Sequence, residues 1–509
     1  MSNIADEGAI AGWPAAALEA FAPALQGSLR ARPQLTEPDL NALGDGRAQR
    51  LQAQVLANRG VAPAEMRDFL RGDWHADPTL AQLPVFRAAV ARLRQAIDAQ
   101  EHITVFGDYD CDGITSCVIL VEALRAAGAA HVASRVPSRD DDGRGLNPDV
   151  VRELHERGTQ LIVTTDCGTA NVAEVEQARS VGMDVLVTDH HPPHGEVVTS
   201  LVDMIVVNPL VEPHPAFDPN LSGAGVAFRV AEALLTSLVS GRPDFSADAI
   251  LESLLDLAAV GTISDLVPLS HANWALAHAG LQRLREAPRP GLRALMESAG
   301  VTPAGLTDRD ISFALAPRLN AAPRLGRPEL ARDLLLAEAP EEARTLAGEI
   351  EALNTRRQDD LEVMMADARE QALEQAPAVA GSIDGTAFEW IADADPRIGP
   401  CLEIIVNGGY SWVPFSRLRE LKFEAPSDLR DKIWVPTQVT WTNGGQAIGF
   451  IPGRYAGSER SDDHDIVLAR KTDWVEQGSD QIGLGQRMLA TDATDYPLLD
   501  ARLISFDVA

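Results

Sequence analysis

Apolar residues in the first half of the chain alternate between short runs and longer periodic segments. Short apolar or β-branched runs, typical of strands, stand at 103–107, 161–165, 184–188 and 204–207. Segments with helical periodicity lie between them, at 115–127, 148–157 and 171–181. Strands that alternate with helices predict parallel βαβ units, so we expect an α/β fold with a parallel sheet.

Helical patterns also flank the predicted sheet. Residues 1–75 hold Ala-, Leu- and Arg-rich segments broken by prolines, which predicts a helical N-terminal region. After the sheet, helical patterns continue at 226–239, 246–260, 274–285 and 328–376. The last is long and highly charged, so it is a candidate connecting helix. We therefore expect a sheet-bearing domain at 76–270 and a connecting helix with part of a second lobe at 271–375.

The composition changes near residue 380. All three lysines and five of the eight tryptophans lie beyond it. Short β-like runs follow at 402–406, 410–415, 433–441 and 447–451. Glycine-rich turns separate several of these runs, as in antiparallel sheets. The pattern predicts a separate, mainly β domain at 376–509.

The overall composition is that of a water-soluble globular protein. The chain has 509 residues, 45% of them hydrophobic and 23% charged, with no apolar run long enough to span a membrane. The N-terminus is acidic, and the four cysteines lack disulfide or zinc spacing, so we expect a cytoplasmic protein. The net charge of −30 opposes non-specific binding to nucleic acid, so such a substrate needs a local arginine-lined path.

Acidic residues and histidines follow the predicted strands. Asp108, Asp110 and Asp112 come after 103–107, Asp166 ends the next strand, and Asp189-His190-His191 comes after 184–188; Asp265 adds a further acidic loop. The carboxyl ends of parallel strands meet at one edge of a sheet, where α/β proteins build their sites. Oxygen ligands mixed with imidazole suit Mn²⁺ or Mg²⁺ better than a thiolate-type zinc site. The sequence therefore predicts a metal-dependent phosphoester hydrolase.

A glycine-rich turn, Ser222-Gly223-Ala224-Gly225, precedes one of the helical segments. Backbone N–H groups at a helix N-terminus bind phosphates, although such a turn is also common where helices pack tightly. An Asp-rich loop or a His pair alone is more often a turn or a surface feature. Their occurrence together, each after an apolar strand, favours a metal site.

Seven ordered motifs give residues 55–360 a resemblance to the DHH phosphoesterase superfamily, and within it to RecJ-type single-strand-specific exonucleases. They are GDYDCDGITS (107–116), TTDCGT (164–169), TDHH (188–191), VNP (207–209), SGAGVAF (222–228), LDLAAVGTISDLVPL (255–269) and PRLNAAPRLG (317–326).

The resemblance implies roles for particular residues. Two Mn²⁺ or Mg²⁺ ions would be held by Asp110, Asp112, Asp166, His190 and Asp265, with Asp108 and Asp189 beside them. His191 would contact phosphate or transfer a proton. The substrate would be bound by Ser222, Gly223, Gly225, Arg318, Asn320 and Arg324.

The sequence departs from the family pattern in two places. Pro323 stands where the family has glycine, which stiffens the turn and removes an N–H group. A Gly-Gly-His-type motif and an OB-fold, which complete RecJ proteins, are not found in this sequence.

Residues 370–509 resemble a different family, the ImpE/TagJ accessory proteins of type VI secretion. The matching stretches begin at GTAFEWIADADPRIGPCLEIIVNGGYSWVPF (385–415) and continue at 428–455, 468–474 and 483–492. This resemblance implies a protein-binding or scaffolding role. Tryptophans and tyrosines beside the turns are either core anchors or a partner surface.

Three hypotheses follow. The first is a RecJ-like 5′-to-3′ exonuclease that cleaves single-stranded DNA with a two-metal hydroxide. The second is a phosphodiesterase for short oligonucleotides or small nucleotides, which the net charge favours. The third is a type VI secretion accessory or scaffold protein that carries the phosphoesterase half as a passenger.

Overall fold

The computed structural model describes residues 35–507, except for short stretches at 45, 73, 78, 140–144, 194–203, 212, 215–216, 241–243, 270, 287–288, 407–408 and 478–479. The helical character expected of residues 1–34 lies outside the described residues. Contacts divide the chain into two compact units: the N-terminal unit ends at Gln358, and the C-terminal unit begins at Asp359. No helix among the described residues is long and apolar enough to cross a bilayer.

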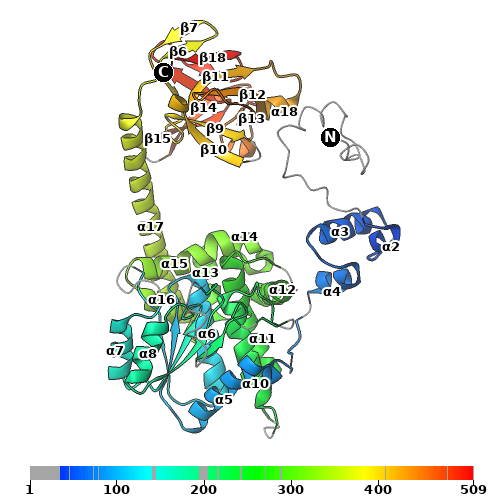
Figure 1. Cartoon of the computed structure of the whole chain (residues 1–509), viewed down its shortest axis with the longest axis vertical. Helices are drawn as coiled ribbons and strands as arrows, with labels where there is room; N and C mark the ends of the chain where they lie inside the picture. Colours follow the sequence, from blue (N-terminus) through cyan, green and yellow to red (C-terminus); the bar gives the residue numbers. More distant parts are fainter. Residues whose placement is uncertain are drawn as a thin grey trace. The chain divides into compact units, whose positions relative to one another are not determined.

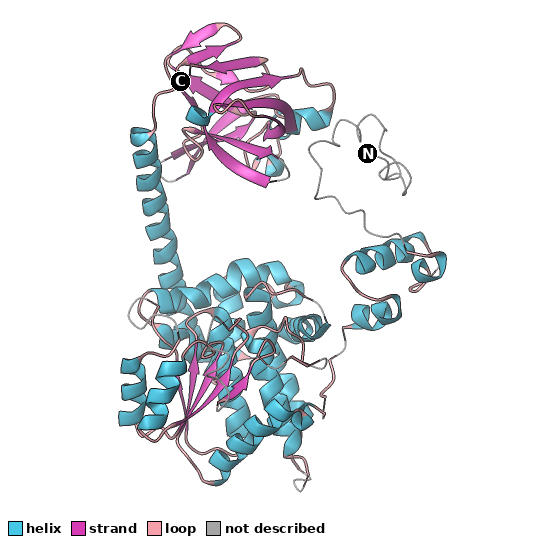
Figure 2. Ribbon diagram, viewed as in Figure 1, coloured by secondary structure: helices cyan, strands magenta, loops and turns pink. Residues whose placement is uncertain are grey.

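A five-stranded parallel sheet forms the centre of the N-terminal unit, with helices on its faces (Figures 1 and 2). The strands run in the order β2-β1-β3-β4-β5. Their bounds are β1 Ile103–Gly107, β2 Val132–Arg135, β3 Leu161–Thr165, β4 Asp184–Thr188 and β5 Ile205–Val207. The expected α/β class and four expected strands are confirmed. β2 was not predicted, because its sequence, Val-Ala-Ser-Arg, has no apolar run; it is a half-exposed edge strand.

Helices account for most of the rest of the N-terminal unit. Those up to the end of the sheet are α2 Glu37–Leu40, α3 Arg47–Asn58, α4 Met66–Arg71, α5 Pro84–Asp98, α6 Cys111–Ala127, α7 Pro148–Glu156 and α8 Val172–Ser180. Those after it are α10 Gly223–Ser237, α11 Ala247–Ser264, α12 His271–Glu286, α13 Pro290–Ser298, α14 Asp308–Asp310, the π-helix η4 Ile311–Leu315, α15 Ala316–Arg324, α16 Pro328–Leu336 and α17 Pro340–Gln375.

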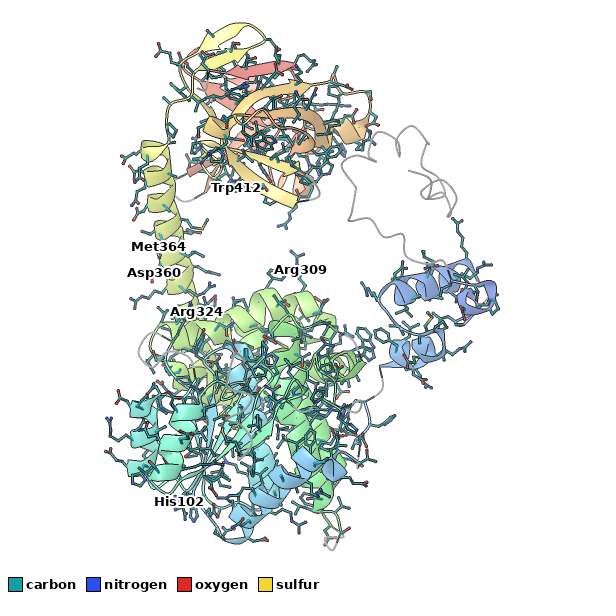
Figure 3. All side chains as sticks on the ribbon, viewed as in Figure 1. His102, Arg309, Arg324, Asp360, Met364 and Trp412 are labelled. Atoms are coloured by element: carbon teal, nitrogen blue, oxygen red, sulfur yellow. The ribbon has the colours of Figure 1, made fainter. Side chains whose placement is uncertain are left out.

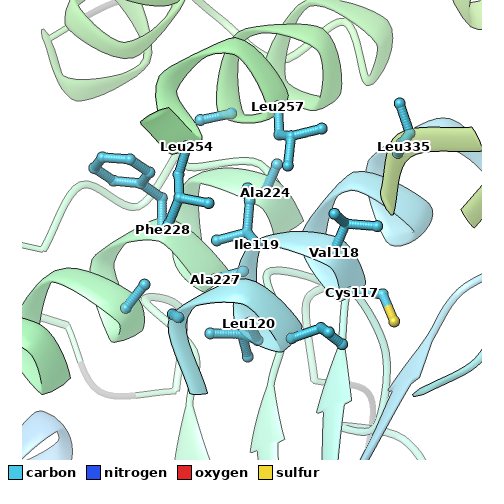
Figure 4. Packing of buried hydrophobic residues seen from close by; sticks show 14 of the residues in the cluster. Cys117, Val118, Ile119, Leu120, Ala224, Ala227, Phe228, Leu254, Leu257 and Leu335 are labelled. Atoms are coloured by element: carbon cyan, nitrogen blue, oxygen red, sulfur yellow. The ribbon is translucent and has the colours of Figure 1, made fainter. Parts of the chain in front are cut away.

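The main core lies between α6, α10 and α11, whose facing residues are almost all apolar (Figure 4). Side chains such as Ile119, Ala227, Phe228 and Leu257 are fully buried there. The helices approach closely, since a Cβ on Gly261 would lie 2.4 Å from that of Ala224. The same core continues through α12–α17 to Ile350, so the domain boundary expected at 270/271 does not separate two cores.

The helix expected at 328–376 is two helices. α16 ends at Leu336, and α17 begins at Pro340. Proline disfavours helical conformation in the residue before it and suits the first helical position, so the break falls where Pro340 stands.

The C-terminal unit is mostly antiparallel sheet, as expected. Its largest sheet has eight strands in the order β10-β9-β13-β12-β11-β18-β6-β7, beside a three-stranded sheet β17-β16-β8 and a hairpin β14-β15. The strands are β6 Gly381–Ile383, β7 Thr386–Phe388, β8 Ile391–Asp393, β9 Cys401–Val406, β10 Gly409–Pro414, β11 Leu418–Phe423, β12 Trp434–Trp441, β13 Gln446–Pro452, β14 Thr472–Gln477, β15 Asp480–Gly485, β16 Met488–Thr491, β17 Tyr496–Pro497 and β18 Leu503–Phe506. Two short helices, α18 Leu429–Ile433 and α19 His464–Val467, connect them.

Candidate functional site

Polar residues form a row at the carboxyl edge of the parallel sheet because four strands end in register. Gly107 is paired with Thr165, Thr165 with Thr188, and Thr188 with Val207. The residues that directly follow β1, β3 and β4 each add one more backbone hydrogen bond between neighbouring strands. The N–H groups of Asp108, Asp166 and Asp189 donate to backbone carbonyls of the next strand at 3.2, 3.0 and 3.1 Å. Strand pairing therefore places three aspartates, followed by Asn208, side by side.

The loop after β1 turns directly into α6 and supplies three carboxylates. Asp108 is fully buried and accepts the N–H of Tyr109 at 2.7 Å. Asp110 caps α6 by accepting the N–H of Gly113 at 3.1 Å, and Asp112 lies in the first turn of the helix. A Cβ at Gly113 would lie 2.6 Å from the Asp108 backbone, so only glycine permits this tight entry.

The N-terminus of α10 binds an anion, but the anion is Asp112. The N–H groups of Gly223 and Ala224 donate to the two Asp112 carboxylate oxygens at 2.6 and 2.9 Å. The next N–H, of Gly225, donates to Ser222 Oγ at 3.0 Å. In this structure the donors at Ser222, Gly223 and Gly225, predicted to bind a substrate phosphate, have partners within the protein, and the phosphate contact stays a prediction. The N–H groups of Gly223 and Ala224 position a candidate metal ligand.

Asp166 and His190 lie at the centre of the cluster. Asp166 Oδ1 and His190 Nε2 are 3.1 Å apart, yet both atoms are buried and neither has a hydrogen-bond partner among the described residues. Since Nε2 makes no such bond, the one between His190 and the Leu221 backbone belongs to Nδ1. A lone pair on Nε2 and a carboxylate oxygen therefore face a common point, as ligands of a metal do.

Three overlapping sets of side chains are close enough to hold ions. In each, the ligand atoms lie within 4.8 Å of one another: Asp166, His190 and His191; Asp112, His190 and Asp265; Asp108, Asp110 and Asp166. Asp265 caps the C-terminus of α11, and its Oδ2 is 3.7 Å from His190 Nε2. The structure thus brings together Asp108, Asp110, Asp112, Asp166, His190, His191 and Asp265, all of them predicted site residues.

The electrostatics of this cluster favour a cation. Burial, together with the charges of Asp265 and Asp110, raises the pKa of Asp112 well above its usual range. Burial and the charges of Asp112 and Asp110 raise the pKa of Asp166 similarly. Burial and the neighbouring His191 lower the pKa of His190 to about 4, so its imidazole is neutral at pH 7. Crowded carboxylates beside a neutral imidazole are the donor set that Mn²⁺ and Mg²⁺ accept, so the residues present fit such ions.

Asp189 supports the site without joining any of these sets. Its Oδ1 accepts the N–H of His190 at 2.7 Å and lies 2.8 Å from His191 Nδ1, and its Oδ2 accepts the N–H of Thr169 at 2.9 Å. Burial raises the pKa of Asp189, but the bonds with His191 outweigh it and lower the pKa. Asp189 thus orients His191, and its predicted place beside the metal ions stays a prediction.

The residues predicted to bind substrate from α15 have different surroundings. Arg318 is held by Glu351, with one N–O distance of 3.1 Å, so its predicted phosphate contact is already taken by a carboxylate. Asn320 Oδ1 is buried without a hydrogen-bond partner among the described residues and stays a candidate. Arg324 lies near two further arginines: burial, Arg139 and Arg357 together lower its pKa, while Tyr109 and Asp110 raise it.

Arg139 and Arg357 were missed by the sequence analysis. The Arg139 guanidinium lies 5.9 Å from the centre of the Tyr109 ring, and the Arg139 backbone N–H donates to the Pro323 carbonyl at 3.3 Å. Arg357 donates to Asn354 at 3.0 Å, and its Nε is buried without a hydrogen-bond partner among the described residues. We call Arg139, Arg324 and Arg357 the arginine cluster. Neither Arg139 nor Arg357 lies in a phosphate-binding sequence pattern, so only their spatial convergence identifies them.

Asn208 was also missed as a supporting residue. Its amide donates to Thr169 Oγ1 and to the His191 carbonyl, both at 2.9 Å. Its place directly after an apolar strand was the signal that could have found it.

Aspartates and paired imidazoles at the carboxyl edge of a parallel sheet define an α/β protein with a candidate divalent-metal centre. Residues 102–262 match the DHH family, N-terminal domain, and residues 385–505 match the ImpE protein family. The N-terminal unit thus carries a region that matches the DHH family, and the C-terminal unit carries one that matches the ImpE family; each match covers less than half of the chain.

Individual relatives agree with this division. Single-stranded-DNA-specific exonuclease RecJ of Escherichia coli (strain K12) is 40% identical over 325 residues, which are 62% of this chain and 55% of that relative. The type VI secretion system accessory component TagJ of Pseudomonas aeruginosa is 49% identical over 139 residues, 27% of this chain and 48% of TagJ. The chain thus spans about half the length of these relatives.

A solved structure also resembles the N-terminal unit. The crystal structure of exonuclease RecJ bound to manganese superimposes with a TM-score of 0.51 and 38% identity, over 59% of this chain and 73% of that one.

Proposed function

We propose that the N-terminal unit is a phosphodiesterase dependent on Mn²⁺ or Mg²⁺ that acts on single-stranded DNA. One observation carries the proposal: Asp166 Oδ1 and His190 Nε2 face each other, buried and unbonded, among carboxylates whose pKa values are raised. The match to RecJ exonucleases, one of them bound to manganese, supports the choice of metal and substrate.

The proposal includes two ions, because Asp166 and His190 are each shared between two of the three ligand sets. Divalent ions at such a site activate water and stabilise the charge that develops on an attacked phosphate. The chain's own contribution is to fix the ligands. α10 holds Asp112 through Gly223 and Ala224, and Asp189 holds His191 through Nδ1.

The arginine cluster gives the substrate an anion-binding path beside the metal centre. Figure 3 labels Arg324 at the end of α15. Arg139 packs over the ring of Tyr109, which stands between Asp108 and Asp110 in the chain, and this contact supports a place for the cluster beside the carboxylates. Guanidinium groups bind phosphate oxygens with paired N–H donors. A local cluster of this kind meets the requirement set by the net charge of −30. The 5′-to-3′ direction of digestion is part of the proposal and rests on the RecJ resemblance alone.

Hydrolysis of 5′-labelled single-stranded DNA with Mn²⁺, beside a dinucleotide substrate, tests this function. We expect release of the labelled 5′-terminal nucleotide from the strand, and loss of this release in Asp110→Ala. Cleavage of the dinucleotide alone would support the small-substrate hypothesis instead. No cleavage of either substrate, in a preparation shown to bind Mn²⁺, would contradict the proposal.

A second function is supported for the C-terminal unit by its match to TagJ. We propose that this unit binds a component of a type VI secretion system. The full chain should retain such a component from a lysate that contains the system, and Asp110→Ala should retain it equally. Loss of retention in Asp110→Ala would contradict independent functions of the two units.

A further inference from the structure

The eight-stranded sheet of the C-terminal unit has two edge strands, β7 and β10, and they differ in how well they are protected from pairing with a further strand. β7 is only three residues long, and short edge strands offer little to a partner strand. β10 has six residues, Gly-Tyr-Ser-Trp-Val-Pro, and among the described residues it pairs with β9 alone. It has no charged residue, and its proline stands only at the last position. β10 thus lacks the devices by which proteins usually keep edge strands from pairing.

Two aromatic side chains stand exposed on β10 and are fixed in place. Tyr410 is 58% and Trp412 is 50% exposed, and Figure 3 labels Trp412 in the C-terminal unit. Trp412 Nε1 donates to the Tyr410 hydroxyl at 2.7 Å, and that hydroxyl donates to Glu403 at 2.8 Å. Glu403 is in turn bound by Arg487, whose side chain is 1% exposed. Rings anchored to a buried group lose little freedom when a partner covers them.

The pairing within the hairpin decides which backbone groups are free. Gly409 is opposite Val406, with two residues between them in sequence, so this pair closes the hairpin with hydrogen bonds. Hydrogen-bonded and non-hydrogen-bonded positions alternate along an antiparallel pair. Ser411 therefore bonds β9, whereas Tyr410 and Trp412 direct their N–H and C=O groups to the open edge.

We propose that β10 pairs antiparallel with β10 of a second copy of this chain, about a two-fold axis at Ser411. In this register Tyr410 faces Trp412 of the second copy, and the two exchange backbone hydrogen bonds with the groups that point to the open edge. Both aromatic pairs form on one face, and cross-strand aromatic pairs stabilise a sheet. The small Ser411 meets its own image at the axis, as a two-fold interface requires.

Charge favours this strand over other surfaces for self-association. With a net charge of −30, most surfaces of two copies repel each other. β10 has no charged residue, so the two copies of β10 do not repel each other, and Glu403 on the neighbouring strand is paired with Arg487. The interface is small, so the dimer should form in a concentration-dependent way. This proposal does not depend on the phosphodiesterase proposal.

A disulfide tests the register directly. Ser411 residues form a non-hydrogen-bonded pair across the axis, for which the Cα–Cα distance is about 4.5 Å, inside the range that a disulfide spans. Ser411→Cys, in a Cys401→Ser background, should give a disulfide-linked dimer under mild oxidation. Thr386→Cys, on the exposed other edge of the same sheet, is the matched control and should stay monomeric.

Sedimentation of the full chain tests the association itself. The wild type should show a concentration-dependent dimer, and Ser411→Lys should remove it by placing two ammonium groups together at the axis. A wild type that is monomeric at every concentration overturns the proposal. So does a dimer that persists in Ser411→Lys, or equal cross-linking of the Ser411→Cys and Thr386→Cys chains.

Discussion

The Asp112 carboxylate accepts the Gly223 N–H at 2.6 Å, across 111 positions of sequence. The contact joins the first turn of α6 to the first turn of α10, and the Ala224 N–H completes it. An anionic side chain at a helix N-terminus is stabilised by the unpaired N–H groups and the helix dipole. The two N–H bonds lower the pKa of Asp112, whereas burial and the neighbouring acids raise it. The second effect is larger, so the pKa of Asp112 is raised overall. The bond thus orients a carboxylate that still needs a cation.

Gly223→Ala should disrupt this arrangement. A Cβ at Gly223 would lie 2.5 Å from Asp166 Oδ1 and 2.6 Å from the Asp166 Cβ, so the Asp166 carboxylate would have to move. We expect Mn²⁺ affinity, measured by titration calorimetry, to fall by about 10–100-fold, as when supporting residues of metal sites are changed. Gly348→Ala, where a Cβ meets nothing within 4 Å, is the control and should bind normally. Equal affinity in both variants would show that Gly223 does not support the site.

Asp166→Asn should separate function from stability. Asp166 has a φ of 61°, a conformation that Asn tolerates, and its burial among acids raises its pKa. Removing the charge should raise the melting temperature of the metal-free protein while abolishing Mn²⁺-dependent cleavage. Thermal unfolding in a chelator and a nuclease assay measure the two effects. Cleavage near the wild-type rate would refute the role of Asp166.

The sequence predicted the edge of the sheet on which the site lies and the residues that gather there, but not what each side chain contacts. Acidic residues directly after the apolar runs of β1, β3 and β4 located Asp108, Asp166 and Asp189 correctly. Whether an aspartate is a free ligand depends on what its oxygens accept. Asp189 is occupied by His191 and by backbone N–H groups, and local sequence does not show this.

Contacts between residues far apart in sequence explain the other differences between the sequence predictions and the structure. The turn at Ser222 has a phosphate-binding pattern, yet its N–H groups meet Asp112, which is far away in sequence. Arg318 lies on α15, a helix that the sequence analysis did not predict, and its partner Glu351 lies on α17. Arg139 and Arg357 converge on Arg324 from two other parts of the chain, so only the fold reveals the arginine cluster.

Mn²⁺ binding should strengthen as pH rises. The raised pKa values of Asp112 and Asp166 mean that the metal-free fold keeps protons there which the unfolded chain has released. Stability of the metal-free protein should therefore fall as pH rises above the ordinary carboxyl range. Mn²⁺ displaces these protons, so its stabilising effect should grow over the same range. His190, with a pKa of about 4, is already neutral and adds nothing near pH 7. Thermal shifts by Mn²⁺ that do not change with pH would contradict this.

Arg357→Gln should weaken substrate binding more than turnover. Its guanidinium belongs to the arginine cluster and has a buried Nε without a hydrogen-bond partner among the described residues. We expect a higher KM for single-stranded DNA, a smaller change in kcat, and a salt dependence of binding reduced by about one phosphate contact. Arg327→Gln is the matched control, since Arg327 is half exposed and paired with Glu329 at 2.9 Å. If KM rises equally in Arg357→Gln and Arg327→Gln, the rise comes from the lost net charge and not from a phosphate contact of Arg357.

Arg487→Met should destabilise the C-terminal unit strongly. Arg487 is 1% exposed, lies 2.6 Å from Asp393, and also binds Glu403 and the Pro452 carbonyl. These two carboxylates outweigh burial and raise the Arg487 pKa, so the arginine stays charged. Methionine fills similar space but leaves Asp393 buried without its counter-ion, a loss of about 3–5 kcal/mol for a broken buried pair. Urea unfolding followed by tryptophan fluorescence measures this loss of stability, because five of the eight tryptophans lie in this unit.

The double variant Arg487→Met/Asp393→Asn should recover part of the lost stability, because it removes the buried charge that has no counter-ion. A double variant no more stable than Arg487→Met alone would mean that packing, and not the charge pair, makes Arg487 essential.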